Sequence, residues 1–565
     1  MKFSEIVYSR PDIQTLQEKF NTLIDEYQKA DSFQKQDAIM KDINNLRMEY
    51  QTQENIAHIK YSIDTFNKDY QKEQDFFDDN NPKYEGIVNR YYEAIVKSKF
   101  RKDLEAKWGD QLFAVADIWM KTYSPEIEED LRKENELRTN YTKLIAAAKI
   151  MFDGEEKNLA ALAPYMQDTN RDMRKQANDA KWKFFTDNAD EFDRLYDELV
   201  KLRHGMAVKL GYKNFIQMGY DRMGRTDYNQ EMVAKFRKYV LDHIVPVTLK
   251  LKKKQQQRLG VSEFKYYDQP IDYSTGNAKP HGSPEWIVNC AVNMYNELSP
   301  ETGEFFNYML ENELMDLVNK KGKDTGGYCT FLEKYKSPFI FSNFNGTMGD
   351  IEVLTHEAGH AFQAYSSRGF EIPEYFFPTS EACEIHSMSM EFLTWPWMHC
   401  FFKDQVEKFK YSHLKGSLIF VPYGVTVDEF QHWVYENPEA TPAERKQAWL
   451  DIEKKYLPYF DYDGNEFLES GGRWQQQRHI YMSPFYYIDY CLAQICAFQF
   501  WKKSIDNREK ALEDYLRLCR EGGSKSFLEL VKVANLISPF EEEGIKSFVS
   551  AVDKWLENFK DGSLN

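Results

Sequence analysis

The chain lacks the long hydrophobic runs and the excess of basic charge that mark several large classes of protein. None of its 565 residues belongs to a run approaching 18 consecutive apolar residues, which argues against a membrane-spanning helix. It carries 73 basic and 90 acidic residues, a net charge of −17. Phosphate backbones and anionic lipids are bound by clustered Lys and Arg, so we expect neither nucleic acid nor a membrane surface as a partner.

Cysteine is also scarce. Seven cysteines are scattered along the chain, and no Cys-x-x-Cys pair occurs. This argues against a disulfide framework or a cysteine-based zinc site and fits a reducing compartment. The N-terminus, Met1 to Glu5, shows no apolar segment of an export signal. The sequence therefore predicts a cytoplasmic protein, and it contains no phosphate-binding loop motif.

The residues that are present predict a large helical protein. The composition is 42% hydrophobic and 15% aromatic, enough to bury a substantial core without disulfides. Apolar residues recur at helical spacing near the N-terminus, as at Leu16, Phe20 and Leu23, so we expect long helices over residues 1–165 and a second region over 166–565. Only Gly326 to Asn345 has a strand pattern. The predicted fold class is mainly α with a small β-sheet.

Residues 355–360, with the sequence THEAGH, form the most informative motif. On a helix His356 and His360 lie on one face, where they can bind one metal ion together. Glu357 lies beside that face, within reach of a water at the metal. Thr347 and Asp350 resemble a capping box that would begin this helix, and Gly369 is a candidate for its end.

A third metal ligand must come from another segment, because Ser366 occupies the position where a longer signature would place a third histidine. The next predicted helix offers three carboxylates, Glu381, Glu384 and Glu391. One of them would complete a His-His-Glu site that keeps an open position for water, and the others could hold the histidine N–H groups. Their spacing alone does not choose among the three.

A second group of candidate residues lies within residues 479–490. A metal hydrolase needs hydrogen-bond donors at the developing oxyanion, and His479, Tyr487 and Tyr490 can supply them. Tyr487 and Tyr490 are three residues apart and share a face of a helix. The alternative interpretation is that these side chains belong to an aromatic core.

Three segments in this order, residues 335–360 (YKSPFIFSNFNGTMGDIEVLTHEAGH), 380–391 and 479–490, resemble the oligoendopeptidase F branch of the thimet-oligopeptidase family of zinc metallopeptidases. The resemblance implies a helical ellipsoid with a deep substrate channel and a small sheet beside the HExxH helix. It also implies one zinc ion per chain, a catalytic metallopeptidase domain over residues 166–565, and an N-terminal helical region over residues 1–165 that forms a wall of the channel.

The resemblance further implies a role for each motif residue. His356, His360 and Glu384 match the zinc ligands, and Glu357 matches the general base. Glu391 matches a carboxylate that supports the site, a role for which Glu381 is the other candidate. His479 matches a substrate-binding histidine, and Tyr490 and Tyr487 match tyrosines that stabilise the tetrahedral intermediate. Ile488 stands where this branch often has Tyr, so Tyr486 remains a candidate as well.

The function that the resemblance implies is cleavage of internal bonds in short peptides. One alternative is an exopeptidase, which would need a charged clamp for a free peptide end. Another is a zinc-containing protein that binds peptides without cutting them, although a purely structural zinc site is usually closed by a fourth protein ligand. The strand from Phe339 to Asn345 is predicted to pair with the substrate main chain. The sequence does not indicate the oligomeric state.

Overall fold

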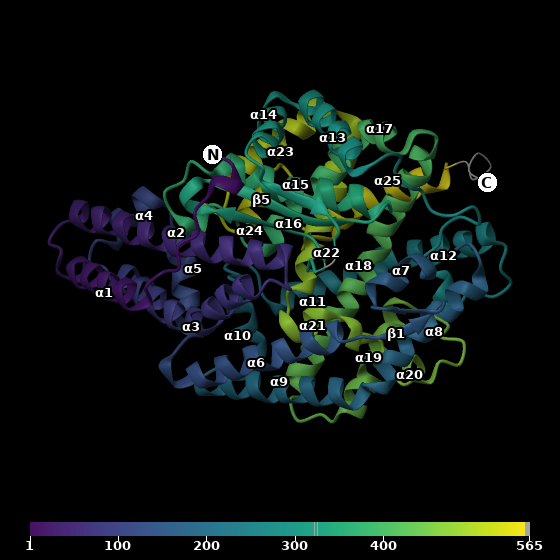
Figure 1. Ribbon diagram of the computed structural model, residues 1–565, viewed down its shortest axis with the longest axis horizontal. Helices are drawn as coiled ribbons and strands as arrows, with labels where there is room; N and C mark the ends of the chain where they lie inside the picture. Colours follow the sequence, from purple (N-terminus) through teal and green to yellow (C-terminus); the bar gives the residue numbers. More distant parts are fainter. Residues whose placement is uncertain (321, 325, 560–565) are drawn as a thin grey trace.

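The structure is a computed structural model of the chain and describes residues 1–320, 322–324 and 326–559. Helices make up 72% of it, which confirms the predicted mainly α class with a small sheet. The N-terminal helices project to one side of a larger body that contains the sheet (Figure 1). The substrate channel and the division at residue 165 stay predictions.

In chain order the helices are α1 (Ile13–Lys29), α2 (Phe33–Ile63), α3 (Lys68–Val96), α4 (Arg101–Trp108), α5 (Gln111–Trp119), α6 (Glu128–Ala146), α7 (Ala163–Met166), α8 (Arg171–Asp187), α9 (Ala189–Lys209), α10 (Phe215–Arg222), α11 (Gln230–Tyr239), α12 (Val245–Leu259), α13 (Pro284–Leu298), α14 (Pro300–Glu311), α15 (Gly349–Ser367), α16 (Ser380–Leu393), α17 (Met398–Phe402), α18 (Val406–Glu436), α19 (Pro442–Tyr456), α20 (Glu466–Glu469), α21 (Arg478–Met482), α22 (Tyr487–Asp506), α23 (Arg508–Glu521), α24 (Phe527–Val533) and α25 (Glu542–Glu557).

The sheet beside α15 has three strands in the order β3 (Met315–Val318), β5 (Ser337–Phe344), β4 (Tyr328–Leu332). Strand β5 runs parallel to β3 and antiparallel to β4, with Ile340 opposite both Met315 and Cys329. Because β5 is the central strand, Ile340 and Phe341 are paired with β3 on one side and with β4 on the other, and they have no free edge for an added peptide strand. The prediction that the segment pairs with the substrate main chain is therefore wrong for these two residues.

A second, two-stranded sheet interrupts the N-terminal region that was expected to be helical. Strands β1 (Ile150–Phe152) and β2 (Glu155–Lys157) form an antiparallel hairpin. Its turn residues, Asp153 and Gly154, have positive φ values of 52° and 77°. An Asp-Gly pair favours this kind of tight turn, so the local sequence did contain a signal for the hairpin.

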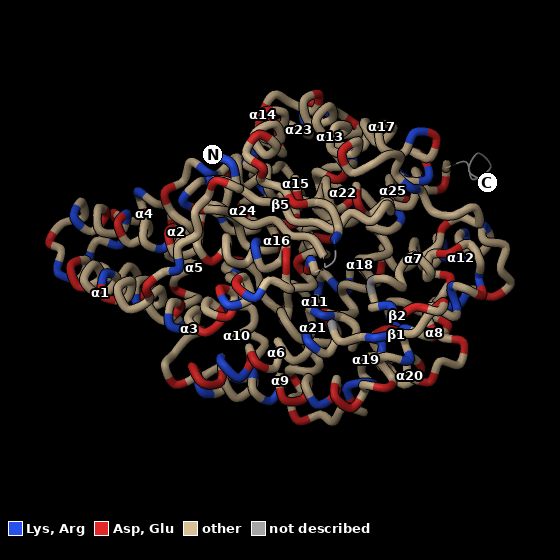
Figure 2. Tube along the Cα trace, in the orientation of Figure 1, with Lys and Arg blue, Asp and Glu red and all other residues tan. Residues whose placement is uncertain are grey.

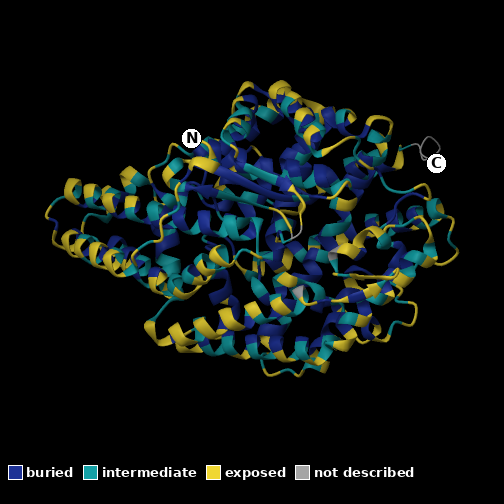
Figure 3. Cartoon of the chain, in the orientation of Figure 1, coloured by how far each residue is buried: buried dark blue, intermediate teal, exposed yellow. Residues whose placement is uncertain are grey.

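The molecule has two main apolar cores. Helices α1 to α5 share the smaller core, which includes Phe20, Tyr91 and Phe113 and also Tyr375, which follows α15 in the chain. The larger core gathers buried residues from the sheet and from α15, α16, α18 and α22. In Figure 3 the buried positions concentrate around the sheet at the centre of this body. Helices α15, α16, α18 and α22 are thus held in the most deeply buried part of the fold.

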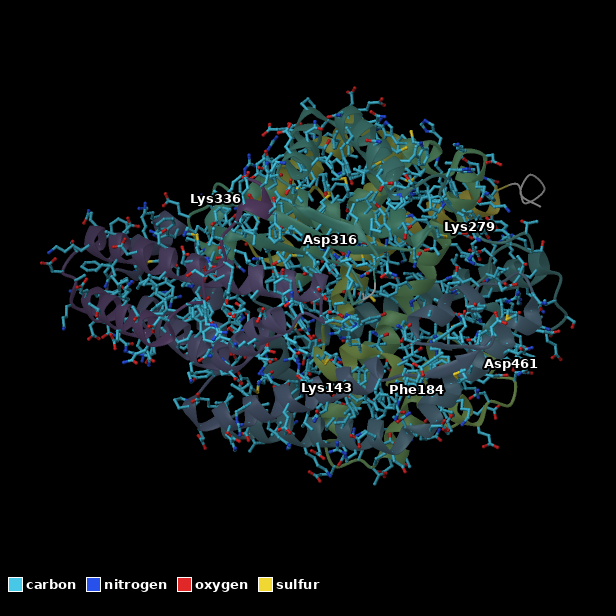
Figure 4. The ribbon with its side chains drawn as sticks, in the orientation of Figure 1. Lys143, Phe184, Lys279, Asp316, Lys336 and Asp461 are labelled. Atoms are coloured by element: carbon cyan, nitrogen blue, oxygen red, sulfur yellow. The ribbon has the colours of Figure 1, made fainter. Side chains whose placement is uncertain are left out.

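Charged residues of both signs are interspersed over the outer helices (Figure 2). On α9, for example, Arg194 pairs with Glu191 and Glu198. Inside the fold, the ammonium group of Lys323 is fully buried and binds Asp316 of β3, labelled in Figure 4, and the carbonyl of Ser342 in β5. This lysine ties the two parallel strands together. None of the helices in the described residues is long and apolar enough to cross a membrane.

Candidate active site

Helix α15 carries the HExxH motif and begins directly after the central strand. The Asp350 carboxylate accepts hydrogen bonds from the backbone N–H groups of Asn345 (2.9 Å) and Gly346 (2.8 Å), which fixes the turn between β5 and the helix. The predicted capping box at Thr347 is wrong, because the cap residue is Met348 and it makes no side-chain capping bond. The helix ends at Ser367, two residues before Gly369.

Helices α15 and α16 approach each other closely at Gly359. A Cβ atom at this position would lie 2.6 Å from Cα of Ser387 and 2.8 Å from the carbonyl oxygen of His386. Only glycine fits such a contact without moving one helix. The Gly359 position in HEAGH therefore brings α16, with its carboxylates, against the two histidines of α15.

His356, His360 and Glu384 converge on one point. The Oε2 atom of Glu384 lies 3.2 Å from Nε2 of His356 and 3.4 Å from Nε2 of His360. In a tetrahedral zinc site with bonds of about 2.0–2.1 Å, neighbouring ligand atoms are ~3.3 Å apart. The three ligand atoms, all within 4.8 Å of one another, therefore fit a single zinc ion.

Glu391 binds His356 through Nδ1, the ring nitrogen that does not face Glu384. Its Oε1 atom accepts a hydrogen bond from Nδ1 of His356 at 2.7 Å, so Nε2 of His356 is left to face the metal position. Its Oε2 atom is 2.6 Å from Nε2 of His413 on α18, and Trp395 donates to the other nitrogen of His413. Burial opposes ionisation, but the bonds to both histidines keep the pKa of Glu391 below its usual value.

His413 and Trp395 were not among the residues that the sequence predicted for the site. Neither belongs to a motif, and His413 lies 53 positions after His360 on another helix. A buried helical histidine gives no sequence signal of its role, because its partner is decided by how α16 and α18 pack.

Glu384 is held by two further side chains. The Tyr486 hydroxyl donates to Oε1 at 2.8 Å, and the Ser387 hydroxyl donates to Oε2 at 3.0 Å. Burial by itself would raise the pKa of Glu384, but His360 and His356 outweigh it and hold the pKa well below the usual range. The side chain is therefore an anion at neutral pH, which is the state in which a carboxyl group can bind a metal ion.

Glu381, the other carboxylate near the start of α16, lies in a different environment. Among the described residues no hydrogen bond or ion pair joins it to His356 or His360. Burial, with Asp489 nearby, raises the pKa of Glu381 to about 8. The geometry thus brings Glu384 and Glu391 to the histidines and leaves Glu381 apart from them.

Glu357 lies near the cluster of His356, His360 and Glu384, in a largely dry environment. The residue is 7% exposed, and burial raises its pKa. A Cβ atom built on Gly327, just before β4, would be only 3.5 Å from Oε1 of Glu357, so backbone closes over the carboxylate there. A carboxylate with a raised pKa is suited to accept and return a proton.

His479 is oriented by a chain of hydrogen bonds. The Tyr423 hydroxyl donates to Oε1 of Gln477, and Nε2 of Gln477 donates to Nδ1 of His479, both at 2.8 Å. This leaves the proton of the ring on Nε2. Burial lowers the pKa of His479 to about 4, so the ring is a neutral N–H donor at physiological pH.

The tyrosines of the cluster differ in their relation to Glu384. The rings of Tyr486 and Tyr490 lie 5.1 Å apart, and the negative charge of Glu384 acts on both hydroxyls. The ring of Tyr487, a residue that is 9% exposed, lies 5.1 Å from the ring of His479 and 5.7 Å from that of Tyr490, and it also packs against Phe420 and Tyr423. Tyr486, kept as a candidate because of Ile488, is the tyrosine that touches the Glu384 carboxylate.

Two family models match this chain. The one described as Peptidase M3 N-terminal domain matches residues 3–123, and the one described as Peptidase family M3 matches residues 164–550. Oligopeptidase PepF of Bacillus subtilis is 22% identical over 423 residues, which cover 72% of this chain and 61% of that protein. The match thus spans less than two thirds of that relative.

Solved structures match along the whole chain. A structure of Pz peptidase A with inhibitor 2 is 59% identical with a TM-score of 0.96, covering 99% of this chain and 100% of that one. A Bacillus anthracis structure with the provisional name oligoendopeptidase F is 54% identical with a TM-score of 0.92, covering 100% and 99%. With a family model that covers more than half of its residues, the chain belongs to peptidase family M3, in the oligoendopeptidase F branch.

Proposed function

We propose that this protein is a zinc-dependent endopeptidase that hydrolyses internal bonds of short oligopeptides. The observation that carries the proposal is the convergence of His356, His360 and Glu384 beside the buried carboxylate of Glu357. The related structures named as peptidases support the same class of reaction. The seven cysteines are all free, which fits our proposal of a cytoplasmic location.

His356, His360 and Glu384 would hold one zinc ion per chain. When bound, zinc supplies Lewis acidity that lowers the pKa of water and polarises the scissile carbonyl group. Two nitrogen donors and one carboxylate leave a position open for water and substrate, as in catalytic zinc sites. Glu391 and His413 keep His356 in the tautomer that presents Nε2.

Glu357 acts as the general base. Its carboxylate takes a proton from the attacking water and later gives it to the leaving amine, so the carboxylate is regenerated at the end of each turnover. Its burial matches this task, because a carboxyl group with a raised pKa holds the proton more readily between the two transfers.

His479 and Tyr490 stabilise the negative charge that develops on the carbonyl oxygen. His479 offers a neutral Nε2–H, and the hydroxyl of Tyr490 is a second donor close to Glu357 and Glu384. Tyr486 holds the Glu384 carboxylate. Tyr487, whose ring lies 5.1 Å from the ring of His479, is the remaining candidate donor.

The test is cleavage of an internally quenched peptide blocked at both ends, by wild type and by Glu357→Gln, with the zinc content of each protein measured. We expect wild type to cut internally, and the variant to keep about one zinc but to lose at least about a hundredfold in kcat. Trimming of free peptides only would favour an exopeptidase. Full zinc content without any cleavage would favour a peptide-binding protein.

A further inference from the structure

The turn that precedes Tyr486 has an unusual backbone. Phe485 has φ of +66°, in the left-handed region that bulky residues rarely adopt, and it lies directly between Pro484 and Tyr486. Such strained residues persist only where the surroundings hold them, and they cluster at functional sites. Because the next residue touches the Glu384 carboxylate, the conformation of Phe485 bears directly on the metal position.

Three separate parts of the chain hold this turn. The backbone N–H of Phe485 donates to Oε1 of Gln431 on α18 at 2.9 Å, and its carbonyl accepts from Nη2 of Arg225 at 2.6 Å. The Phe485 ring is fully buried and faces Gly219 on α10, where a Cβ atom would lie 2.6 Å from the ring. The turn is therefore fixed at its N–H, its carbonyl and its side chain.

Arg225 also fixes the first turn of α22. The same Nη2 atom donates to Oδ1 of Asp489 at 2.7 Å, and both side chains are completely buried. The guanidinium stacks on the ring of Tyr220, 4.3 Å from its centre. Asp489 follows Tyr486 by three residues, and its N–H donates to the Tyr486 carbonyl. The buried guanidinium of Arg225 thus binds the chain on both sides of Tyr486, at the Phe485 carbonyl and at the Asp489 carboxylate.

We propose that Arg225 is a positioning residue, which holds the Phe485 carbonyl and Asp489 together and so fixes the Tyr486 hydroxyl on Glu384. The inference rests on the proposed function, because it holds that the fixed turn at Phe485 serves to keep Glu384 in place as a zinc ligand. Arg225 itself has no contact with the histidines of the site among the hydrogen bonds and ion pairs of the described residues. Its effect passes through Phe485 and Tyr486.

The test is a double-mutant cycle with Arg225→Met and Tyr486→Phe. Two quantities are measured for each protein: kcat on the blocked peptide, and the rate at which zinc is lost to an excess of chelator. We expect each single variant to lower kcat and to speed zinc loss by about 10- to 100-fold, with a smaller change in KM. If Arg225 acts through Tyr486, the double variant is no worse than Tyr486→Phe alone.

A matched control is Arg174→Met on α8, which breaks another buried Arg–Asp pair, with Asp268, in a different part of the molecule (Figure 1). We expect it to lower the melting temperature and leave kcat and zinc loss unchanged. If Arg225→Met fails to fold, Gly219→Ala is used in its place. Gly219 lies on α10, and the methyl group added there would displace the Phe485 ring. We expect the double variant Gly219→Ala with Tyr486→Phe to be no worse in kcat or zinc loss than Tyr486→Phe alone.

Effects that multiply in the double variant would overturn the proposal, since they would show that Arg225 acts independently of Tyr486. Unchanged zinc loss and kcat in Arg225→Met would overturn it as well. If the wild type binds zinc but does not cut blocked peptides, the proposed function fails by itself. The chelator experiment then still decides whether Arg225 and Tyr486 act together on the metal ligand.

Discussion

His413 on α18 is hydrogen-bonded to Glu391 on α16, with 2.6 Å between Nε2 and Oε2. The acceptor nitrogen of His413 is already taken by the indole N–H of Trp395, so His413 must donate to the carboxylate. The other oxygen of Glu391 binds His356. A helix with no motif residue therefore helps to set the orientation of a proposed metal ligand.

Replacing His413 tests this connection. In His413→Leu the Glu391 carboxylate loses one of its two partners and holds His356 less firmly, so we expect zinc affinity to fall about 10- to 100-fold. Competition with a chromogenic chelator measures it. His413→Gln, which keeps an N–H donor, should lose less. His243→Gln, at a partly exposed histidine that pairs with Glu542, is the control. Equal affinity in wild type and His413→Leu would contradict the connection.

Glu384 and Glu381 offer a direct comparison on one helix. Glu384→Gln removes the anionic ligand between His356 and His360, and we expect the purified protein to contain far less than one zinc per chain. Glu381→Gln should retain full zinc, because the Glu381 carboxyl has a pKa of about 8 and an amide resembles its neutral form. Metal analysis of both variants decides between them. If instead Glu381→Gln lost its zinc and Glu384→Gln kept it, Glu381 would be the third ligand.

The sequence predicted the members of the site better than their arrangement. The HExxH spacing placed His356, Glu357 and His360 on one helix, and α15 confirms that helix. Spacing could not choose among Glu381, Glu384 and Glu391, because the choice depends on the crossing of α15 and α16. The pairing order of the strands was equally hidden, since β3 and β5 are separated by 18 residues and become neighbours only through tertiary packing.

Gly359 allows a test of that helix crossing. In Gly359→Ala the new methyl group would meet Cα of Ser387 at 2.6 Å, so α15 and α16 must separate. We expect a loss of about 1–3 kcal/mol in the free energy of unfolding, together with weaker zinc binding. Gly416→Ala on α18 is the matched control, because nothing lies within 4 Å of its added Cβ atom. There alanine should be neutral or stabilising.

Chemical denaturation of these two variants, with and without zinc, measures both effects. Equal stabilities for Gly359→Ala and Gly416→Ala would show that α16 can shift without cost, and the close contact would then have no role in forming the site.

The buried cluster of Glu134 with Arg203 and Arg222 makes stability depend on pH. Oε1 of Glu134 lies 2.6 Å from Nε of Arg203, and Oε2 lies 3.0 Å from Nη1 of Arg222. Burial opposes ionisation, but the two arginines outweigh it and lower the pKa of Glu134 from 4.5 to about 2. Because the folded pKa is below the unfolded one, the ionised group stabilises the fold above pH 4.5, and this contribution is lost between pH 4.5 and 2.

Glu134→Gln should therefore be less stable than wild type at pH 7, by on the order of 3 kcal/mol, and the difference should shrink as the pH falls below about 4.5. Urea denaturation of both proteins from pH 7 down to pH 3 measures the difference. Glu439→Gln is a suitable control, because Glu439 is exposed in the turn between α18 and α19. A stability difference for Glu134→Gln that stays constant over this range would mean that the carboxylate is not held ionised by the arginines.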